Sequence, residues 1–286
     1  MRRSPISARE GISPQKTMLS GRVPDSPVFY AGRAGDSPFQ FGEIIPAGTV
    51  LVKPVLAWFH PDTAHEAAIP FDYAVVGTAA GLVVVDKPCF LPATSNGRLV
   101  RETVQTRLRV RYRNPDIVPV HRLDRLTCGL LACATDVAAR GFYQQQFAER
   151  TARKTYRARL CAEPGIGSEW QEIVLPMRRV PGQRAVEVAV GGVETRTHVR
   201  ALDSRLVELQ PLTGFTHQLR VVCAYLGAPI EGDDTYPVDV GLQLHNYSTP
   251  MKLCATRLEL REWGSDRRLV WTSPRVAESD FRVSRE

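Results

Sequence analysis

The order of apolar and polar positions divides most of the chain into short elements. Two nearly continuous apolar runs predict strands buried on both faces, and one alternating segment predicts a half-buried strand with Tyr156 and Leu160 on its apolar face. The buried runs are residues 82–86 (LVVVD) and 127–134 (TCGLLACA), the alternating segment is 154–160 (KTYRARL), and further strands are predicted at 206–209 and 253–260.

Helical spacing of apolar residues occurs in three segments. The best defined is residues 216–227 (THQLRVVCAYLG), whose apolar side chains recur along one face and which ends at Gly227. Helices are also expected at residues 100–112 and 136–150, the latter capped by Thr135 or Asp136. Strands outnumber helices and do not alternate with them regularly, so the pattern predicts an α+β fold.

The first 70 residues have a different character. They are rich in Gly, Pro and Ser, and only short runs such as residues 49–52 and 55–59 are compatible with strands. We therefore expect a small appendage at 1–70, joined by a linker near 61–70 to a larger domain at 71–286.

The charge balance is basic. Among 286 residues, 37 are Lys or Arg and 30 are Asp or Glu, which gives a net charge of +7. This excess favours a polyanionic partner such as nucleic acid, although many proteins carry a few extra arginines. Five arginines in residues 101–113 could contact phosphate or form a solvated helix face, and these readings weigh equally.

The absence of apolar targeting segments and the spacing of the cysteines bear on where the protein is located and whether it binds metal. No apolar run approaches the ~20 residues of a membrane span, and the N-terminal MRRSPISARE lacks the apolar stretch of a secretory signal. A cytoplasmic protein with no membrane partner is expected. Its six cysteines form no C-x-x-C pair, which predicts reduced core thiols and no metal.

One segment combines charge with a predicted buried strand. Residues 121–129 (HRLDRLTCG) place Asp124 between two arginines, directly before an apolar run. A carboxylate there could be a nucleophile, a base, a metal ligand or a salt-bridge partner. By composition alone, the salt bridge is the favoured reading.

That segment resembles the H-R-L-D-x-x-T-S-G motif of the RluA-type RNA pseudouridine synthases. Five further stretches resemble motifs of the same family in the same order, and the likeness covers roughly residues 70–262. They are residues 81–88 (GLVVVDKP) with Leu91 and Pro92, residues 154–158 (KTYRA), residues 212–220 (LTGFTHQLR), residues 227–233 (GAPIEGD) with Tyr236, and residues 253–258 (LCATRL).

The resemblance implies a mixed, mostly antiparallel sheet with flanking helices and a central cleft. It also implies isomerisation of uridine to pseudouridine, in which the N1–C1′ bond breaks and the base reattaches through C5, without cofactor or metal. Asp124 would be the nucleophile, Tyr156 would pack against the base and help to remove a proton, and Arg220 would pair with Asp124. A carboxylate needs no general base, but in a half-buried site it needs a guanidinium to stay ionised.

An RNA-binding set follows from the same motifs. Arg122 would fill the stack left by the flipped uridine. His121 and His217 are expected to form structural hydrogen bonds rather than act as catalysts, and Lys87 either caps a turn or touches phosphate. The residues predicted to bind RNA are Arg122, His121, Lys87, Lys154, Thr216 and His217.

Some residues depart from the family pattern. Phe215 stands where an arginine is usual, which removes one cation, although an aromatic ring could stack on a base. Cys128 stands where the family has Ser or Ala, and Cys254 stands where it has His; both are small changes. The first 70 residues match no clear S4 RNA-binding module, so a degenerate S4-like region and an unrelated appendage are both open.

Three functions are compatible with these features. The first is an isomerase acting as a monomer on structured RNA, with large-subunit ribosomal RNA as the leading substrate and transfer RNA as the alternative. The second is a non-catalytic RNA-binding protein or chaperone on the same scaffold. The third, a hydrolase with Asp124 as base, lacks supporting residues.

Overall fold

The computed structural model describes residues 4–63, 66–95 and 98–277. The chain forms two compact units, one of Met1–Ala68 with Thr94–Ile117 and one of Ile69–Ala93 with Val118–Glu286. The predicted boundary near residue 70 falls beside the first of these breaks. The structure also groups residues 94–117 with the N-terminal unit, although the sequence prediction assigned them to the larger domain.

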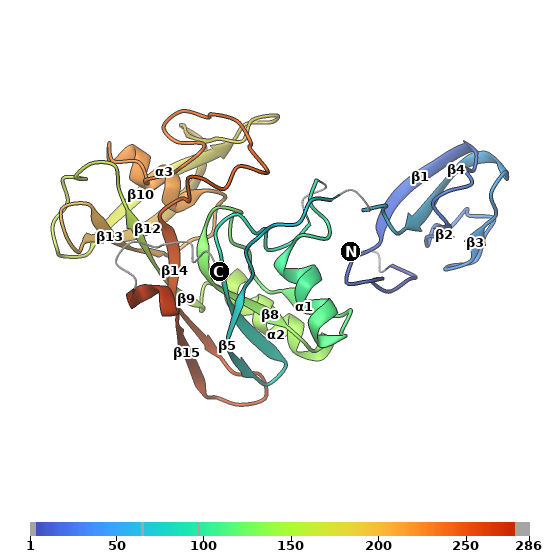
Figure 1. The fold of residues 1–286 in the computed structure, drawn as a ribbon, viewed down its shortest axis with the longest axis horizontal. Coiled ribbons are helices and arrows are strands. Elements are labelled where there is room, and N and C mark those ends of the chain that lie inside the picture. Colours follow the sequence, from blue (N-terminus) through green and yellow to red (C-terminus); the bar gives the residue numbers. More distant parts are fainter. Residues whose placement is uncertain (1–3, 64–65, 96–97, 278–286) are drawn as a thin grey trace. The chain divides into compact units, whose positions relative to one another are not determined.

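The first unit contains a four-stranded antiparallel sheet in the order β1-β4-β2-β3 (Figure 1). The two strands expected at residues 49–52 and 55–59 form one continuous strand. It passes through Pro54 without a break, because Pro54 lies where the register between β1 and β4 shifts. Proline, which has no N–H to donate, is tolerated at such an irregularity. The elements are β1 (Gln15–Arg22), β2 (Phe29–Ala31), β3 (Ile44–Ile45), β4 (Val50–Phe59) and α1 (Val104–Tyr112).

Helix α1 begins at Val104, later than the pattern predicts. The backbone N–H groups of residues 100–102 donate to the Glu66 carboxylate at 2.6 to 3.1 Å, which holds them outside the helix. The Thr103 hydroxyl then accepts from the N–H of Thr106 at 3.1 Å as the N-cap. Local carboxylate and hydroxyl acceptors therefore set this boundary.

Some of the five arginines at residues 101–113 form hydrogen bonds or ion pairs within the first unit. Arg109 is buried, and its guanidinium donates to the carbonyls of Ile117 and Gly11 and to the hydroxyl of Ser13. Arg101 forms an ion pair with Glu10. These contacts give Arg109 a structural place in the first unit.

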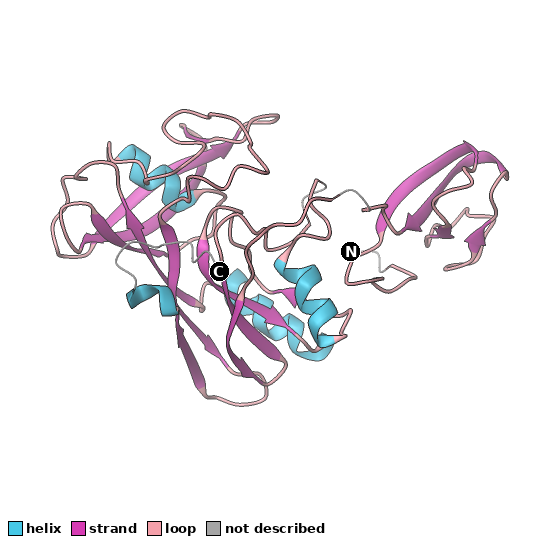
Figure 2. Cartoon of the chain, in the orientation of Figure 1, coloured by secondary structure: helices cyan, strands magenta, loops and turns pink. Residues whose placement is uncertain are grey.

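The second unit contains an eleven-stranded sheet in the order β11-β10-β12-β13-β9-β14-β8-β6-β5, with β15 beside β14 and β7 beside β8 (Figures 1 and 2). Its pairs are antiparallel except β14 with β8. The predicted α+β fold with a mixed, mostly antiparallel sheet is confirmed. The elements are β5 (Ala74–Ala79), β6 (Leu82–Lys87), β7 (Val118–Pro119), β8 (Cys128–Ala134), α2 (Val137–Ala148), β9 (Arg153–Arg159), β10 (Gln171–Arg179), β11 (Val186–Val188), β12 (Val193–Ala201), β13 (Leu206–Pro211), α3 (Gln218–Tyr225), β14 (Leu253–Arg261), β15 (Arg268–Thr272) and the 3₁₀ helix η1 (Pro274–Ala277).

The core of this unit lies around β6 and β8, in which every residue is buried. Helix α2 packs against β8 and β14 and starts where the carboxylate of Asp136 accepts from the N–H of Ala138 at 2.8 Å. Tyr143 of α2 is fully buried and donates to the carbonyl of Ala80 at 2.7 Å. The continuous apolar runs are thus strands covered on both faces.

Five of the six cysteines are buried thiols, as the sequence predicts. The prediction is wrong for Cys161, whose side chain is exposed just beyond the end of β9. In the part of the chain that the structure describes, no helix has the length and apolar character of a membrane span.

Candidate active site

Asp124 lies in the connection between β7 and β8, directly before a buried strand. Its side chain is 36% exposed, and its backbone carbonyl accepts from the N–H of Thr127 at 3.1 Å, which closes a turn. At Gly129 a Cβ atom would lie 2.3 Å from the carbonyl oxygen of Ala255, and the φ of Gly129 is +101°. Only glycine allows β8 and β14 to approach this closely behind the turn.

Arg220 lies in the first turn of α3 and is buried. Its Nη1 is 3.8 Å from Oδ2 of Asp124, so the expected neighbours are together. Its hydrogen bonds, however, go to Asp233 at 2.8 and 2.5 Å and to Asp234 at 3.0 Å. Asp233 therefore orients the guanidinium of Arg220. Asp124 interacts with the positive charge of this guanidinium over a longer distance.

The charge of Arg220 is secure despite burial. Burial disfavours the charged guanidinium, but the hydrogen bonds and charge of Asp233, with the charges of Asp124 and Asp234, raise the pKa of Arg220. The site thus keeps one permanent cation within ion-pair distance of the candidate nucleophile.

His217 and Tyr236 form the next layer. His217 has a left-handed φ of 56° and precedes α3, with its Nε2 4.0 Å from Oδ2 of Asp124. Its Nδ1 is 3.1 Å from the hydroxyl of Tyr236, which also accepts from the N–H of Val186 at 2.7 Å. Burial lowers the pKa of His217, so a neutral ring is favoured. In a neutral ring, Nδ1 can then accept a hydrogen bond from the hydroxyl of Tyr236. The ring proton is in that case on Nε2, the nitrogen nearer to Asp124.

Tyr156 lies on β9, is buried, and pairs across the sheet with Leu209 and Ala255. Burial raises the pKa of its hydroxyl far above the ordinary value, and the charge of Asp124 adds to this effect. Ionised tyrosinate is therefore disfavoured here. The expected roles of Tyr156, packing against the uracil base and helping to remove a proton, stay predictions.

Lys87, expected either to cap a turn or to touch phosphate, has no exposed surface. Its ammonium donates to the carbonyls of Pro88, Leu91 and Arg125 at 2.9, 2.8 and 3.1 Å. Burial lowers the pKa of Lys87 to about 8. All three donors are used inside the protein, so the contacts match the turn-capping alternative. Lys87 fixes the backbone one residue after Asp124.

His121, also expected in the RNA-binding set, is engaged by the fold. Its Nε2 accepts from the N–H of Ala132 at 3.1 Å, and its ring stacks on Phe147 with centroids 4.5 Å apart. Burial and the charge of Lys154 lower the pKa of His121 to about 3. The ring is thus neutral near pH 7 and serves as an acceptor.

This buried histidine predicts acid sensitivity of the fold. Between pH 6.5 and about 3 the unfolded chain binds a proton at His121 that the folded chain does not, so stability falls as pH falls. Relative to His121→Gln, whose amide oxygen can accept the same bond, the wild type should lose about 2 kcal/mol between pH 7 and pH 5. Urea unfolding of both proteins at the two pH values measures this. A pH-independent difference would contradict it.

The remaining predicted RNA contacts lie at different depths. Arg122 is exposed, and no described residue pairs with its side chain. Lys154 is half-buried, and burial lowers its pKa. Thr216 is half-buried beside His217. Phe215, which stands where the family has an arginine, donates its backbone N–H to Oε1 of Gln218 at 3.0 Å. RNA binding by these residues stays a prediction.

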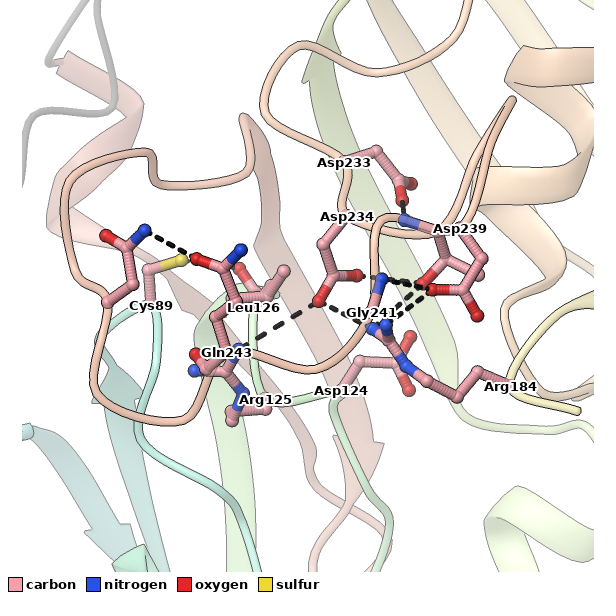
Figure 3. A network of polar contacts seen from close by, with 12 residues as sticks. Cys89, Asp124, Arg125, Leu126, Arg184, Asp233, Asp234, Asp239, Gly241 and Gln243 are labelled. Carbon is pink, nitrogen blue, oxygen red and sulfur yellow. Dashed lines mark hydrogen bonds and ion pairs between the residues drawn. The ribbon is translucent and has the colours of Figure 1, made fainter.

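Sequence reasoning did not assign roles to the carboxylates that hold Arg220. Asp233 and Asp234 follow the Gly227–Gly232 stretch, and Asp234 also accepts from Arg184 at 2.6 Å. Figure 3 shows these acids beside Asp124 and Arg125. Asp233 ends the motif at residues 227–233 in the sequence, but no local pattern links Asp233 to Arg220 or Arg184 to Asp234.

The deciding observation is a family match over the segment that carries this site. Residues 81–225 match the model described as RNA pseudouridylate synthase, and this segment includes Asp124, Tyr156 and Arg220. The chain belongs to the RNA pseudouridylate synthase family. The resemblance to RluA-type members is confirmed.

Relatives and solved structures agree with this membership. The chain is 30% identical over 225 residues to RNA pseudouridine synthase 7 of Arabidopsis thaliana, covering 73% of this chain and 56% of that protein. It is 33% identical over 170 residues to the dual-specificity RNA pseudouridine synthase RluA of Vibrio vulnificus, covering 54% and 65%. The chain thus matches less than two thirds of either relative.

A solved structure shows the same fold. The structure titled Human RNA Pseudouridylate Synthase Domain Containing 1 superposes with a TM-score of 0.57 at 25% identity, covering 73% of this chain and 91% of that one. A second, titled Human RNA Pseudouridylate Synthase Domain Containing 4, gives a TM-score of 0.54 at 25% identity, covering 71% and 89%.

Proposed function

We propose that this protein converts uridine to pseudouridine in RNA, with Asp124 as the nucleophile. The observation that carries the proposal is the partly exposed carboxylate of Asp124 within 3.8 Å of the buried Arg220 guanidinium, in a chain of this family. Arg220 places a permanent positive charge beside this carboxylate, and a carboxylate nucleophile needs no separate base to attack. Tyr156 supplies a buried aromatic surface near Asp124 for the base.

The reaction is an isomerisation that gains and loses no atoms overall. The N1–C1′ bond breaks, a C5–C1′ bond forms, the proton on C5 leaves and N1 takes up a proton. The uridine must leave its stack to reach Asp124, at a cost of about a few kcal/mol. The exposed guanidinium of Arg122, two residues before Asp124, is free to enter the vacated position.

For the substrate, the names of relatives support large-subunit ribosomal RNA, with transfer RNA as the alternative. One relative is named ribosomal large subunit pseudouridine synthase C, from Vibrio cholerae, at 28% identity over 180 residues. Basic charge supplies sequence-independent affinity for such RNA. A cytoplasmic monomer that uses no metal or cofactor is the form that we propose.

Pseudouridine mapping in cells tests the function. Pseudouridines are mapped at single-nucleotide resolution in total RNA from cells with and without the gene. We expect at least one site to disappear on deletion and to return with the wild-type chain, and that site names the substrate. If every pseudouridine survives deletion, the proposal fails.

A further inference from the structure

Two arginines lie close to Asp124 but have no part in the proposed reaction. Arg125 follows the nucleophile directly, and Arg184 comes from the connection between β10 and β11. Both reach the same atom, Oδ2 of Asp234, at 3.9 Å from Nη2 of Arg125 and 2.6 Å from Nη2 of Arg184 (Figure 3). The two guanidinium groups are therefore neighbours.

Arg184 also forms an ion pair with a second carboxylate, which is more exposed than Asp234 and therefore easier to displace from the guanidinium. Its Nη1 donates to Oδ1 of Asp239 at 2.6 Å, and the two side chains are 30% and 34% exposed. Ion pairs with this much solvent access contribute little to stability. Arg184 also donates to the hydroxyl of Thr235 at 3.2 Å. Of its two carboxylate partners, Asp239 is thus the more easily exchanged and Asp234 the firmer.

Arg125 is held less completely. Its side chain is 12% exposed and lies over the ring of Phe90, with Cζ 5.7 Å from the centroid. Nη2 donates to the carbonyl of Gln243 at a long 3.4 Å, and Nη1 is buried without a partner among the described residues. Burial lowers the pKa of Arg125. A buried guanidinium N–H without an acceptor is costly, so this group favours any anion that reaches it.

Apart from Asp234, one carboxylate and one carbonyl that contact the two arginines come from a single segment. Residues 237–249 contain no helix or strand and supply the carboxylate of Asp239 and the carbonyl of Gln243. Val238 and Val240 on this segment are 69% and 64% exposed, so few apolar contacts hold its middle. Tyr247, near its end, packs against Phe90. The N–H of Val240 donates to the carbonyl of Asp234 at 3.1 Å, so displacing the middle of the segment breaks this hydrogen bond but few apolar contacts.

We propose that Arg125 and Arg184 form a phosphate-binding pair for the RNA backbone beside the target uridine, and that Asp239 and Gln243 occupy the pair while RNA is absent. This inference rests on the proposed function. The phosphates of a flipped nucleotide stay attached to its ribose, so they come within one nucleotide of Asp124. Arginine binds phosphate in bidentate geometry, and a phosphate satisfies the donors that the segment leaves weakly paired.

The alternative is a purely structural role, in which Arg184 holds Asp234, and Asp234 holds Arg220. The two roles predict opposite effects for Asp239. A phosphate site gains affinity when its competing carboxylate is neutralised, whereas a scaffold gains nothing from losing an ion pair.

Binding of a fluorescein-labelled 12-nucleotide oligouridylate to the full chain, followed by anisotropy between 50 and 300 mM KCl, separates them. We expect Arg184→Gln to weaken binding by roughly tenfold and to lower the salt slope by about one. Arg125→Gln should act in the same direction. The control is Arg178→Gln, which removes an equal charge from an exposed ion pair with Glu187 at the same hairpin and should change binding less than about twofold.

Asp239→Asn should change RNA affinity in the opposite direction to Arg184→Gln. It should tighten binding by roughly threefold or more, because Arg184 loses its competitor. Glu187→Gln, with the same charge change away from the pair, is the matched control. This arm does not depend on how well Arg184→Gln folds.

Two results would overturn the phosphate-binding pair. One is binding by Arg184→Gln that equals that of Arg178→Gln, and the other is unchanged or weaker binding by Asp239→Asn. Kinetics on the RNA that deletion mapping identifies give a further check, since phosphate contacts raise KM and a scaffold defect lowers kcat. Binding is measured without turnover, so these failures differ from the loss of the proposed function, which the deletion map alone reports.

Discussion

Replacing Asp124 with asparagine should abolish pseudouridine formation and leave the fold and RNA binding intact. The amide has nearly the shape of the carboxylate but cannot act as a nucleophile, so the rate should fall by roughly a thousandfold or more. The side chain is 36% exposed, and Arg220 keeps its hydrogen bonds to Asp233 and Asp234, so the buried network persists. Pseudouridine content of the mapped RNA after incubation with each protein measures the effect.

The control for this substitution is Asp266→Asn, which removes one carboxylate from an exposed turn between β14 and β15. Its rate should match that of the wild type. Asp124→Asn should bind the RNA at least as well as the wild type, because one negative charge is lost near the backbone. If Asp124→Asn still forms pseudouridine at a comparable rate, Asp124 is not the nucleophile.

The sequence predicts the buried strands β6 and β8 better than strands on the other side of the sheet, such as β12. Strands β6 and β8 are buried throughout, so their apolar runs are visible without any structure. Strand β12 escaped prediction because its buried face carries Thr195 and Thr197. Thr195 donates to the carbonyl of Leu175, and Thr197 accepts from Gln218. Polar side chains whose hydrogen bonds are satisfied in the core conceal the alternation on which strand prediction depends.

The site shows a similar division. Motifs in the sequence identify Asp124 and Arg220 as neighbours, and the structure places them within 3.8 Å. The motifs do not show that Arg220 spends its hydrogen bonds on Asp233, because that pairing depends on the turn after α3. Nor could they show Lys87 with three carbonyl partners, since backbone acceptors have no sequence signature.

These second partners change how the site is understood. Arg220 cannot be described as the counterion of Asp124 alone, because it is shared among three carboxylates. Sharing places a positive charge 3.8 Å from Asp124 without a direct hydrogen bond from the guanidinium to the oxygen that would attack the substrate. The buried pair with Asp233 fixes the guanidinium, and the longer contact with Asp124 supplies charge.

Replacing Arg220 with glutamine should therefore lower both stability and activity, for separable reasons. The side chain of Asp233 is 0% exposed, so removal of the Arg220 guanidinium leaves a buried carboxylate with no cationic partner in the described part of the chain. Of the described groups, only the backbone N–H groups of Thr235 and Tyr236, at 2.8 and 3.0 Å, would still donate to it. The expected loss is about 3–5 kcal/mol of the free energy of unfolding, measured with urea. Activity should fall as well, because Asp124 loses its only permanent cation within 4 Å among the described residues.

The double variant Arg220→Gln with Asp233→Asn separates the two losses. It removes the uncompensated charge and should recover part of the stability, as in a double-mutant cycle between coupled groups. It should not recover activity, because Asp124 still lacks the guanidinium. Arg178→Gln, which breaks an exposed pair, should change neither property appreciably. Recovery of activity with stability would show that Arg220 acts only through folding, whereas stability regained without activity means that the charge of Arg220 at Asp124 is itself required for the reaction.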